Sequence, residues 1–508
     1  MSEGSAQGVA IGERSALREL VVVAFPAVVT MTSYTAMQFT DALVVSRLGP
    51  EAVAAQGNGG ISAFVPASIM FGIVSMVNTF ASQNLGAGRP ERGAAYLWNS
   101  LWLTVVVWAV LLMPYAAALP WVFSAMRGVM HLEVDPTVAP MEVVYGRILL
   151  AGMVFTIAAR GMSHYFFGLH RPRVVLVSAL VANALNVVLS IALVHGMWGF
   201  PRMGIAGSAL GTVIGGSVEF LIPMGLFLSA RYAKAYGTRT SWRIDWAKMR
   251  EIVRIGWPAG AMWGNEIVCW WVFMAGLNAH FGVEHDAAGW MVLRYMHLSF
   301  MPAVGLSIAM TAVVGKLIGA GRRDLVHSRT WLGVKVAMVY MGLCAVVMVV
   351  FRGSLITVFL GAADIAPELR AEVMRIGSTL LLVAAAFQVF DAIAITISGA
   401  LRGAADTLWP GVVMIVLSWV CIVGLGWGLV VWAPHLESLG PWIGAATYIV
   451  ALAVAYFWRF ESGAWKRITV VDQPVMPPGG DSGQGIVPEL PGVDLPETSP
   501  AASDAGAV

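Results

Sequence analysis

Long apolar runs are the feature that most constrains the fold of this chain. An α-helix rises about 1.5 Å per residue, so about 20 apolar residues cross a hydrocarbon layer about 30 Å thick. Such runs recur along the sequence, and charged residues make up only 12% of its 508 residues. The sequence therefore predicts an all-α polytopic membrane protein. We expect twelve spans, at residues 20–46, 56–84, 98–121, 145–167, 174–195, 204–229, 252–281, 288–318, 331–351, 376–401, 410–432 and 440–458.

The second half of the chain repeats the first. LGAGR at residues 85–89 corresponds to IGAGR at 318–322, and Pro26 and Gly49 correspond to Pro258 and Gly282. Each repeat holds six spans, an even number, so both repeats have the same orientation in the membrane. We expect two six-helix bundles related by a pseudo-two-fold axis along the membrane normal.

Charge and composition predict where the parts of the chain lie. Lys and Arg concentrate in alternate loops, which indicates a multi-pass protein of a bacterial-type plasma membrane with both termini in the cytoplasm. Residues 461–508 are rich in Pro, Gly and acids and predict a disordered tail. The expected parts are a cytoplasmic N-terminus (1–17), an N-lobe (18–230), a cytoplasmic linker (231–250), a C-lobe (251–460) and the tail.

Several classes of function are not favoured. The formal net charge is only +2, which indicates no nucleic-acid partner. The three cysteines lack metal-ligand spacing, and the sequence has no HExxH or GxSxG motif, so we expect neither a cofactor nor an enzyme. A channel would need a pore loop, which is not visible. We expect a monomer in the lipid bilayer.

Asp41 is the only carboxylate or basic side chain in the run from Leu20 to Ser46. A carboxylate at membrane depth costs about 2.5 to 3.5 kcal/mol on insertion scales, so it should face protein or water. Helical spacing places Tyr34, Met37 and Gln38 on its face, which we interpret as the wall of a substrate cavity.

Two more acids, Glu266 and Asp391, lie at membrane depth in the second half. Indole rings and thioethers beside a carboxylate suit an aromatic organic cation, although packing alone also explains such residues. Glu219 and Arg294 are weaker candidates, the first near the water and the second as a structural ion pair. The other residues expected around the acids are Met262, Trp263 and Trp270 near Glu266, Phe387 and Gln388 near Asp391, and Asn183, Asn186 and Ser190 near Asp41.

The order of several motifs resembles the multidrug and toxic compound extrusion (MATE) family over nearly all of residues 14–460. These motifs are FTDALVVSRLGPEAVAA, SQNLGAGRPERG, GLHRPR, LNVVLSIALVHG with GIAGSALGTVI, WPAGAMWGNEI, VVGKLIGAGRR and FQVFDAIAITISGALRGAADT. The resemblance implies an antiporter that expels organic cations in exchange for H⁺ or Na⁺ by alternating access.

The resemblance also implies roles for individual residues. Asp41 matches the first-helix aspartate of the family, and Asn186 matches its fifth-helix asparagine. Glu266 and Asp391 match the glutamate and aspartate of the NorM-like branch, where they are a possible Na⁺ site. Two departures, Ser190 for Asn or Asp and Phe387 for Tyr, remove oxygen ligands from Na⁺ and shift the expectation slightly towards H⁺.

The expected mechanism is competition between positive charges. A buried carboxyl group holds a proton or a cationic substrate, but not comfortably both. The main alternative is a lipid-linked oligosaccharide flippase of the same superfamily, which should have a strongly basic cavity. Here the carboxylates outnumber Arg160 and Arg294 in the spans, which favours the cation exporter.

Overall fold

The computed structural model describes residues 3–130, 138–360, 367–468 and 470. Its regular structure is helical throughout these residues. The first half comprises α1 (Glu3–Ser46), α2 (Pro50–Ser75), α3 (Val77–Gly86), α4 (Pro90–Val107), η1 (Trp108–Leu112), α5 (Met113–Met130), α6 (Val138–Gly168), α7 (Pro172–His195), α8 (Ile205–Phe227) and α9 (Ala230–Tyr236).

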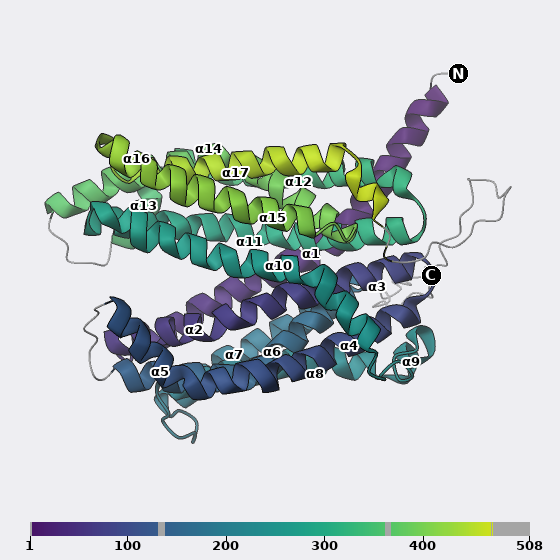
Figure 1. The fold of residues 1–508 in the computed structure, drawn as a ribbon, viewed down its shortest axis with the longest axis horizontal. Coiled ribbons are helices and arrows are strands. Elements are labelled where there is room, and N and C mark those ends of the chain that lie inside the picture. Colours follow the sequence, from purple (N-terminus) through teal and green to yellow (C-terminus); the bar gives the residue numbers. More distant parts are fainter. Residues whose placement is uncertain (1–2, 131–137, 361–366, 469, 471–508) are drawn as a thin grey trace, which may run out of the picture.

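The second half follows the same plan after residue 245. Figure 1 shows the two halves as two layers of long, roughly parallel helices. The elements are α10 (Trp246–Trp271), η2 (Val272–Asn278), η3 (Ala279–Phe281), α11 (Val283–Gly319), α12 (Arg323–Val350), α13 (Arg352–Leu360), α14 (Pro367–Gly403), α15 (Leu408–Leu417), η4 (Ser418–Leu425), α16 (Gly426–Trp432), η5 (Pro434–Leu436), α17 (Leu439–Glu461) and η6 (Ala464–Arg467).

Eleven helices within the described ranges are long and apolar enough to cross a membrane, where the sequence predicts twelve spans. The difference is the predicted span 252–281, which is helical in α10 and η2. Arg254, Asn265 and Glu266 make α10 more polar than its neighbours. α10 nevertheless runs beside α15 in Figure 1, in the same layer as the apolar helices.

The backbone repeats as the sequence motifs do. Gly49 and Gly282 precede α2 and α11 with φ values of 114° and 115°, a conformation that side chains strongly disfavour. Gly88 and Gly321 close the next turn of each half at φ values of 70° and 75°. The same turns therefore recur 233 residues apart.

Helix α1 packs against both halves. Leu20, Val23 and Ala24 belong to the apolar core of the second half. Ala27 and Met31 belong instead to a core of the first half. The change of partner coincides with Pro26, which interrupts the hydrogen-bond ladder of the helix. The first helix therefore passes from one half to the other.

A polar seam joins the halves at the end of the molecule that carries α3. Asn78 Nδ2 donates to the Ile308 carbonyl at 3.0 Å, and Gln83 Nε2 donates to the Gly403 carbonyl at 2.8 Å. A Cβ on Gly72 would lie 2.4 Å from the Gly260 backbone, so the helices are in close contact there. In Figure 1 the two layers diverge from this end towards the end with α5 and α13.

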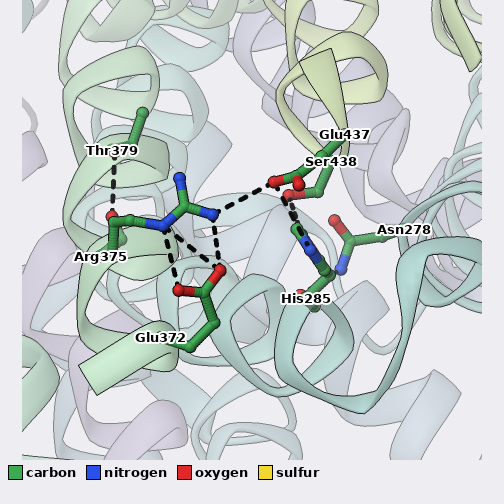
Figure 2. Close-up of polar contacts among 7 residues, drawn as sticks. All are labelled: Asn278, His285, Glu372, Arg375, Thr379, Glu437 and Ser438. Carbon is green, nitrogen blue, oxygen red and sulfur yellow. Dashed lines mark hydrogen bonds and ion pairs between the residues drawn. The ribbon is translucent and has the colours of Figure 1, made fainter. Parts of the chain in front are cut away.

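At the opposite end, a charged network ties the second half together, as Figure 2 shows. Arg375 donates to Glu372 at 2.6 Å and to Glu437 at 3.2 Å. His285 Nδ1 lies 2.8 Å from Ser438 Oγ. The network links α11, α14 and the turn before α17.

The residues after α17 continue briefly along the second half. Trp465 in η6 is 2% exposed and stacks on Phe460 at a ring distance of 5.7 Å. The predicted disordered tail spans residues 461–508, and its part from 471 to 508 lies outside the described residues.

Candidate membrane-depth carboxylate sites

The first site surrounds Asp41 in the C-terminal half of α1. Asp41 is 7% exposed, and its Oδ2 accepts hydrogen bonds from Thr212 Oγ1 at 3.2 Å and Asn186 Nδ2 at 3.5 Å. Its Oδ1 has no hydrogen-bond partner among the described protein atoms. One carboxylate oxygen is thus held by the protein, and the other is available to a proton or a cation.

Glycines in α8 bring this polar shell together. A Cβ on Gly211 would lie 2.7 Å from Ser190 Oγ, and one on Gly215 would lie 3.0 Å from Asn186 Cβ. Small residues let membrane helices approach closely, and their spacing of four keeps them on one face. The close contact of α7 with α8 therefore sets the positions of Asn186 and Ser190.

Other polar residues complete the surroundings of Asp41. Asn183 Nδ2 donates to Ser33 Oγ at 2.9 Å, which ties α7 to α1. Ser190 is fully buried beside the carboxyl group but makes no hydrogen bond of good geometry. Tyr145 on α6 is close enough to interact with Asp41 electrostatically. Sequence reasoning missed Tyr145 and Thr212, because neither type is unusual in an apolar helix.

The predicted face of α1 continues to a second polar cluster. Tyr34 donates a hydrogen bond to Glu219 on α8. The Arg160 guanidinium lies over the Tyr34 ring at 4.9 Å. Met37 is half-buried, whereas Gln38 is exposed. Tyr34 therefore serves as a partner of Glu219 and Arg160, a grouping that the sequence analysis did not identify.

The second site lies between α10 and α14. Glu266 and Asp391 are half-buried and close enough to repel each other electrostatically when both are ionised. Neither forms an ion pair within 4.0 Å in the part of the chain that the structure describes. Tyr448 on α17 is buried and interacts with both acids. Two acids therefore share one region in which no Lys or Arg among the described residues pairs with them directly.

The predicted wall residues of this site divide into two groups. Met262, Trp263 and Trp270 on α10 are half-buried. Phe387 and Gln388 on α14 are both 1% exposed. Gln388 donates to Ser299 at 3.0 Å, inside the second half. The side chains on α10 are therefore accessible, whereas those of Phe387 and Gln388 lie in the interior.

Arg402 is a charged residue that sequence reasoning missed. It donates to Ser307 Oγ at 2.7 Å and interacts electrostatically with Glu266 and with His164 of the first half. Its backbone carbonyl accepts a hydrogen bond from Thr79 at 2.8 Å. The sequence did offer one signal for Arg402: it is a single basic residue at the end of the apolar run 376–401. Arg402 thus connects the second site to the seam.

A comparison with family models decides the family. The MatE model matches residues 26–192 and 264–427, one match in each half. The chain belongs to the MatE family. The family resemblance and the all-helical membrane fold expected from the sequence are confirmed. MATE proteins are transporters rather than enzymes.

Curated relatives and solved structures agree with this assignment. The chain is 28% identical to a probable multidrug resistance protein NorM of Mesorhizobium japonicum, over 88% of this chain and 94% of the relative. It is 27% identical to the corresponding protein of Pseudomonas putida, with the same coverage. A crystal structure of MATE in the bent conformation matches with a TM-score of 0.78 at 18% identity, over 89% of this chain and 96% of that one.

The MATE fold also matches a transporter of the MOP superfamily from Pyrococcus furiosus. That match has a TM-score of 0.78 at 19% identity and covers 89% of this chain and 97% of the other. At these identities the structural matches establish the fold. The chemistry of transport has to be argued from the acids of this chain.

Proposed function

We propose that this MATE-family transporter exports small organic cations in exchange for H⁺ or Na⁺ by alternating access between its lobes. The observation that carries the proposal is the pair of acids Glu266 and Asp391, which have no ion-pair partner within 4.0 Å among the described residues. Two carboxylates held this close resist ionising together, so the pair favours the binding of a positive charge.

Aromatic cations fit the accessible side of this pair. Trp263 and Trp270 stand on the same helix as Glu266 and are half-buried. An indole face attracts a cation within about 6 Å by roughly 2 kcal/mol when water is excluded. The carboxylates supply charge and the rings supply apolar contact. A proton or Na⁺ at the acids competes with such a substrate and releases it.

Asp41 is proposed as the coupling-ion group of the N-lobe. Its Oδ2 is fixed by Thr212 and Asn186, and its Oδ1 is available to the ion. H⁺ is favoured slightly over Na⁺, because a hard cation prefers several oxygen ligands. Ser190 and Phe387 supply fewer oxygens than the side chains usual in the family. A Na⁺ at Glu266 and Asp391 remains the alternative.

The seam indicates which side is closed. Asn78, Thr79 and Gln83 bond backbone carbonyls of the other half near α3. The Lys and Arg distribution supports a cytoplasmic location for this end, together with both termini. In the proposed cycle this arrangement is closed to the cytoplasm and open outwards, and the seam has to separate when substrate enters from inside. The proposed location is a bacterial plasma membrane, as a monomer.

The test is transport by purified protein in proteoliposomes. A pH or Na⁺ gradient should drive ethidium across the membrane, and the gradient that works identifies the ion. Asp41→Asn, Glu266→Gln and Asp391→Asn should each slow transport at least about tenfold, equivalent to about 1.4 kcal/mol. Asp324→Asn is the matched control, because Asp324 is exposed and its ion pair among the described residues is with Arg322. Wild-type rates in all three variants would falsify the proposal.

The flippase alternative has one observation in its favour. Arg160 lies between the rings of Tyr34 and Phe71, at 4.9 Å and 5.8 Å, and Arg402 is close to the seam. Basic groups of this kind suit a phosphate-bearing substrate. A lipid-linked oligosaccharide that competes with ethidium for binding, and is itself moved across the bilayer, would favour this second function.

A further inference from the structure

The segment that joins the lobes is fixed against α4. Trp98 Nε1 donates to the Thr238 carbonyl at 2.7 Å, and Trp102 Nε1 donates to the Trp242 carbonyl at 2.9 Å. Between them, Asn99 Oδ1 accepts from the Asp245 backbone N–H at 2.8 Å. The three donors and acceptors on α4 occupy one face of the helix. This part of the linker, from Thr238 to Asp245, therefore has a defined place on the N-lobe.

Two hollows flank this segment. One has a volume of about 580 Å³ and is walled by three indole rings and one leucine, with Arg239 as its only charged residue. The other has a volume of about 510 Å³ and contains Arg243, Lys248 and Ser241. Each hollow thus holds an arginine from the same stretch of linker, and the first also offers an aromatic slot, formed by Trp98, Trp102, Leu228 and Trp242.

The charge of this region is strongly positive. The only acid between Arg231 and Arg250 is Asp245, which caps α10 and pairs with Lys248. The Lys248 ammonium holds the pKa of Asp245 below its usual range. Arg239 Nε donates to the Leu228 carbonyl at 2.8 Å, and no acid lies within 4.0 Å of Arg239 or Arg243 among the described residues. These two guanidinium groups are available to an anion.

The region also lies where a membrane surface is expected. The helical run Pro90–Ala125 has 36 residues, more than the roughly 20 that cross the hydrocarbon, so its first turns extend into the interface. Trp242 and Trp246 are 55% and 74% exposed. Exposed indoles are costly in water but are favoured at the level of lipid headgroups.

We infer that an anionic phospholipid binds at this linker. Its headgroup phosphate contacts Arg239, the start of an acyl chain lies in the aromatic slot of the same hollow, and Arg243 in the second hollow adds positive charge nearby. Clusters of Lys and Arg next to a membrane span attract anionic lipids, and a guanidinium matches a phosphate with paired hydrogen bonds. A soluble anion would use the arginines but would leave the indoles exposed, so the slot favours a lipid.

The experiment measures lipid retention by the full-length protein with native mass spectrometry. Phosphatidylglycerol and phosphatidylcholine with identical acyl chains are titrated into protein in neutral detergent. Wild type should retain phosphatidylglycerol at least about tenfold more tightly than phosphatidylcholine. Arg239→Gln with Arg243→Gln should remove this preference. The matched control is Arg47→Gln with Arg352→Gln, which removes two exposed charges at the opposite end of the molecule and should leave it intact.

A third variant tests the aromatic slot. Trp242→Ser removes the ring but keeps the carbonyl that Trp102 bonds, and it should weaken retention of both lipids. Equal retention of the two lipids by wild type, or unchanged preference in the double arginine variant, would overturn the inference. So would displacement of phosphatidylglycerol by millimolar inorganic phosphate, which would identify a free-anion site. If phosphatidylglycerol is preferred only after residues 471–508 are deleted, the lipid is not the occupant in the full-length protein. The acidic residues 471–508 would then occupy the arginine site, and the inference would be overturned.

Discussion

The two halves of this transporter share a backbone plan but hold their acids differently. In the N-lobe a single acid, Asp41, is enclosed by hydrogen-bond donors from α7 and α8. In the C-lobe two acids, Glu266 and Asp391, stand together, half-buried and without an ion-pair partner within 4.0 Å in the described ranges. The two halves therefore repeat the backbone but differ in the electrostatic environment of their acids.

The difference suggests a division of labour. An enclosed acid with fixed donors suits a small ion, because Asp41 is only 7% exposed and its Oδ2 is already hydrogen-bonded. An accessible acid pair beside indole rings suits a larger cation, since it offers both charge and apolar surface. We therefore propose that coupling depends mainly on Asp41 of the N-lobe and that recognition of the substrate's charge depends mainly on Glu266 and Asp391 of the C-lobe.

The largest expected effect is on ethidium affinity, and it distinguishes the acids that bind substrate from the acid that couples transport to the ion. Glu266→Gln combined with Asp391→Asn should weaken ethidium binding about 100-fold, because two attractive charges are lost, equivalent to about 2.7 kcal/mol. Asp41→Asn should change that affinity less than about threefold while it abolishes gradient-driven transport. Fluorescence anisotropy in detergent measures the binding. Equal losses of affinity in both lobes would show that the acids act as one site.

A packing change should disturb the N-lobe site without touching a polar residue. Gly211→Leu should lower the stability by about 1 to 3 kcal/mol, because its side chain would overlap Ser190 and push α7 away from α8. Gly225→Leu on the same helix is the control, since no atom lies within 4 Å of a Cβ there. Thermal unfolding in detergent compares the two. Similar melting temperatures would contradict the close α7–α8 contact.

The hydrogen bond from Thr212 should matter in proportion to its strength. Thr212→Val should reduce transport about tenfold, since a hydrogen bond to a charged group contributes about 1.5 to 3 kcal/mol. Thr212→Ser keeps the hydroxyl and should retain most of the activity. If Val and Ser behave alike, the hydroxyl has no role at Asp41 and the polar enclosure is not what distinguishes the lobes.

The smallest expected effect is a pH dependence of stability, which comes from a turn whose sequence differs between the repeats. His170 and Ala405 occupy equivalent turns with φ values of 56° and 61°. Burial, with Lys316 nearby, lowers the pKa of His170 to about 3. The unfolded chain binds a proton below about pH 6.5 while the folded protein does not, so stability should fall as the pH drops from 7 to 5.5, by about 1 kcal/mol.

His170→Asn tests this pH dependence, because Asn tolerates the left-handed backbone and does not titrate. The variant should lose less stability than wild type between pH 7 and 5.5. Melting temperatures in buffered detergent provide the measurement. An identical decrease in the two proteins would assign the pH dependence to other groups.

Helical spacing and apolar length predicted much of this architecture from the sequence. The spans and the repeat follow from patterns along the sequence, and the family resemblance directed attention to both Asp41 and Asn186. Thr212 and Tyr145 could not be found in that way, because their importance depends on which helices touch. The same limit applies to Phe387. It shares a helical face with Asp391, but the packing of α14 in the C-lobe buries it completely.

The shared helix α1 has a practical consequence for engineering. Ala27 and Met31 of this helix pack in a core of the N-lobe, whereas Leu20, Val23 and Ala24 pack in the apolar core of the C-lobe. A C-terminal fragment that starts after the linker would lack these side chains and expose an apolar groove. Chimeras that exchange halves between relatives should therefore carry residues 16–25 with the second half, because the chain's midpoint is not its structural border.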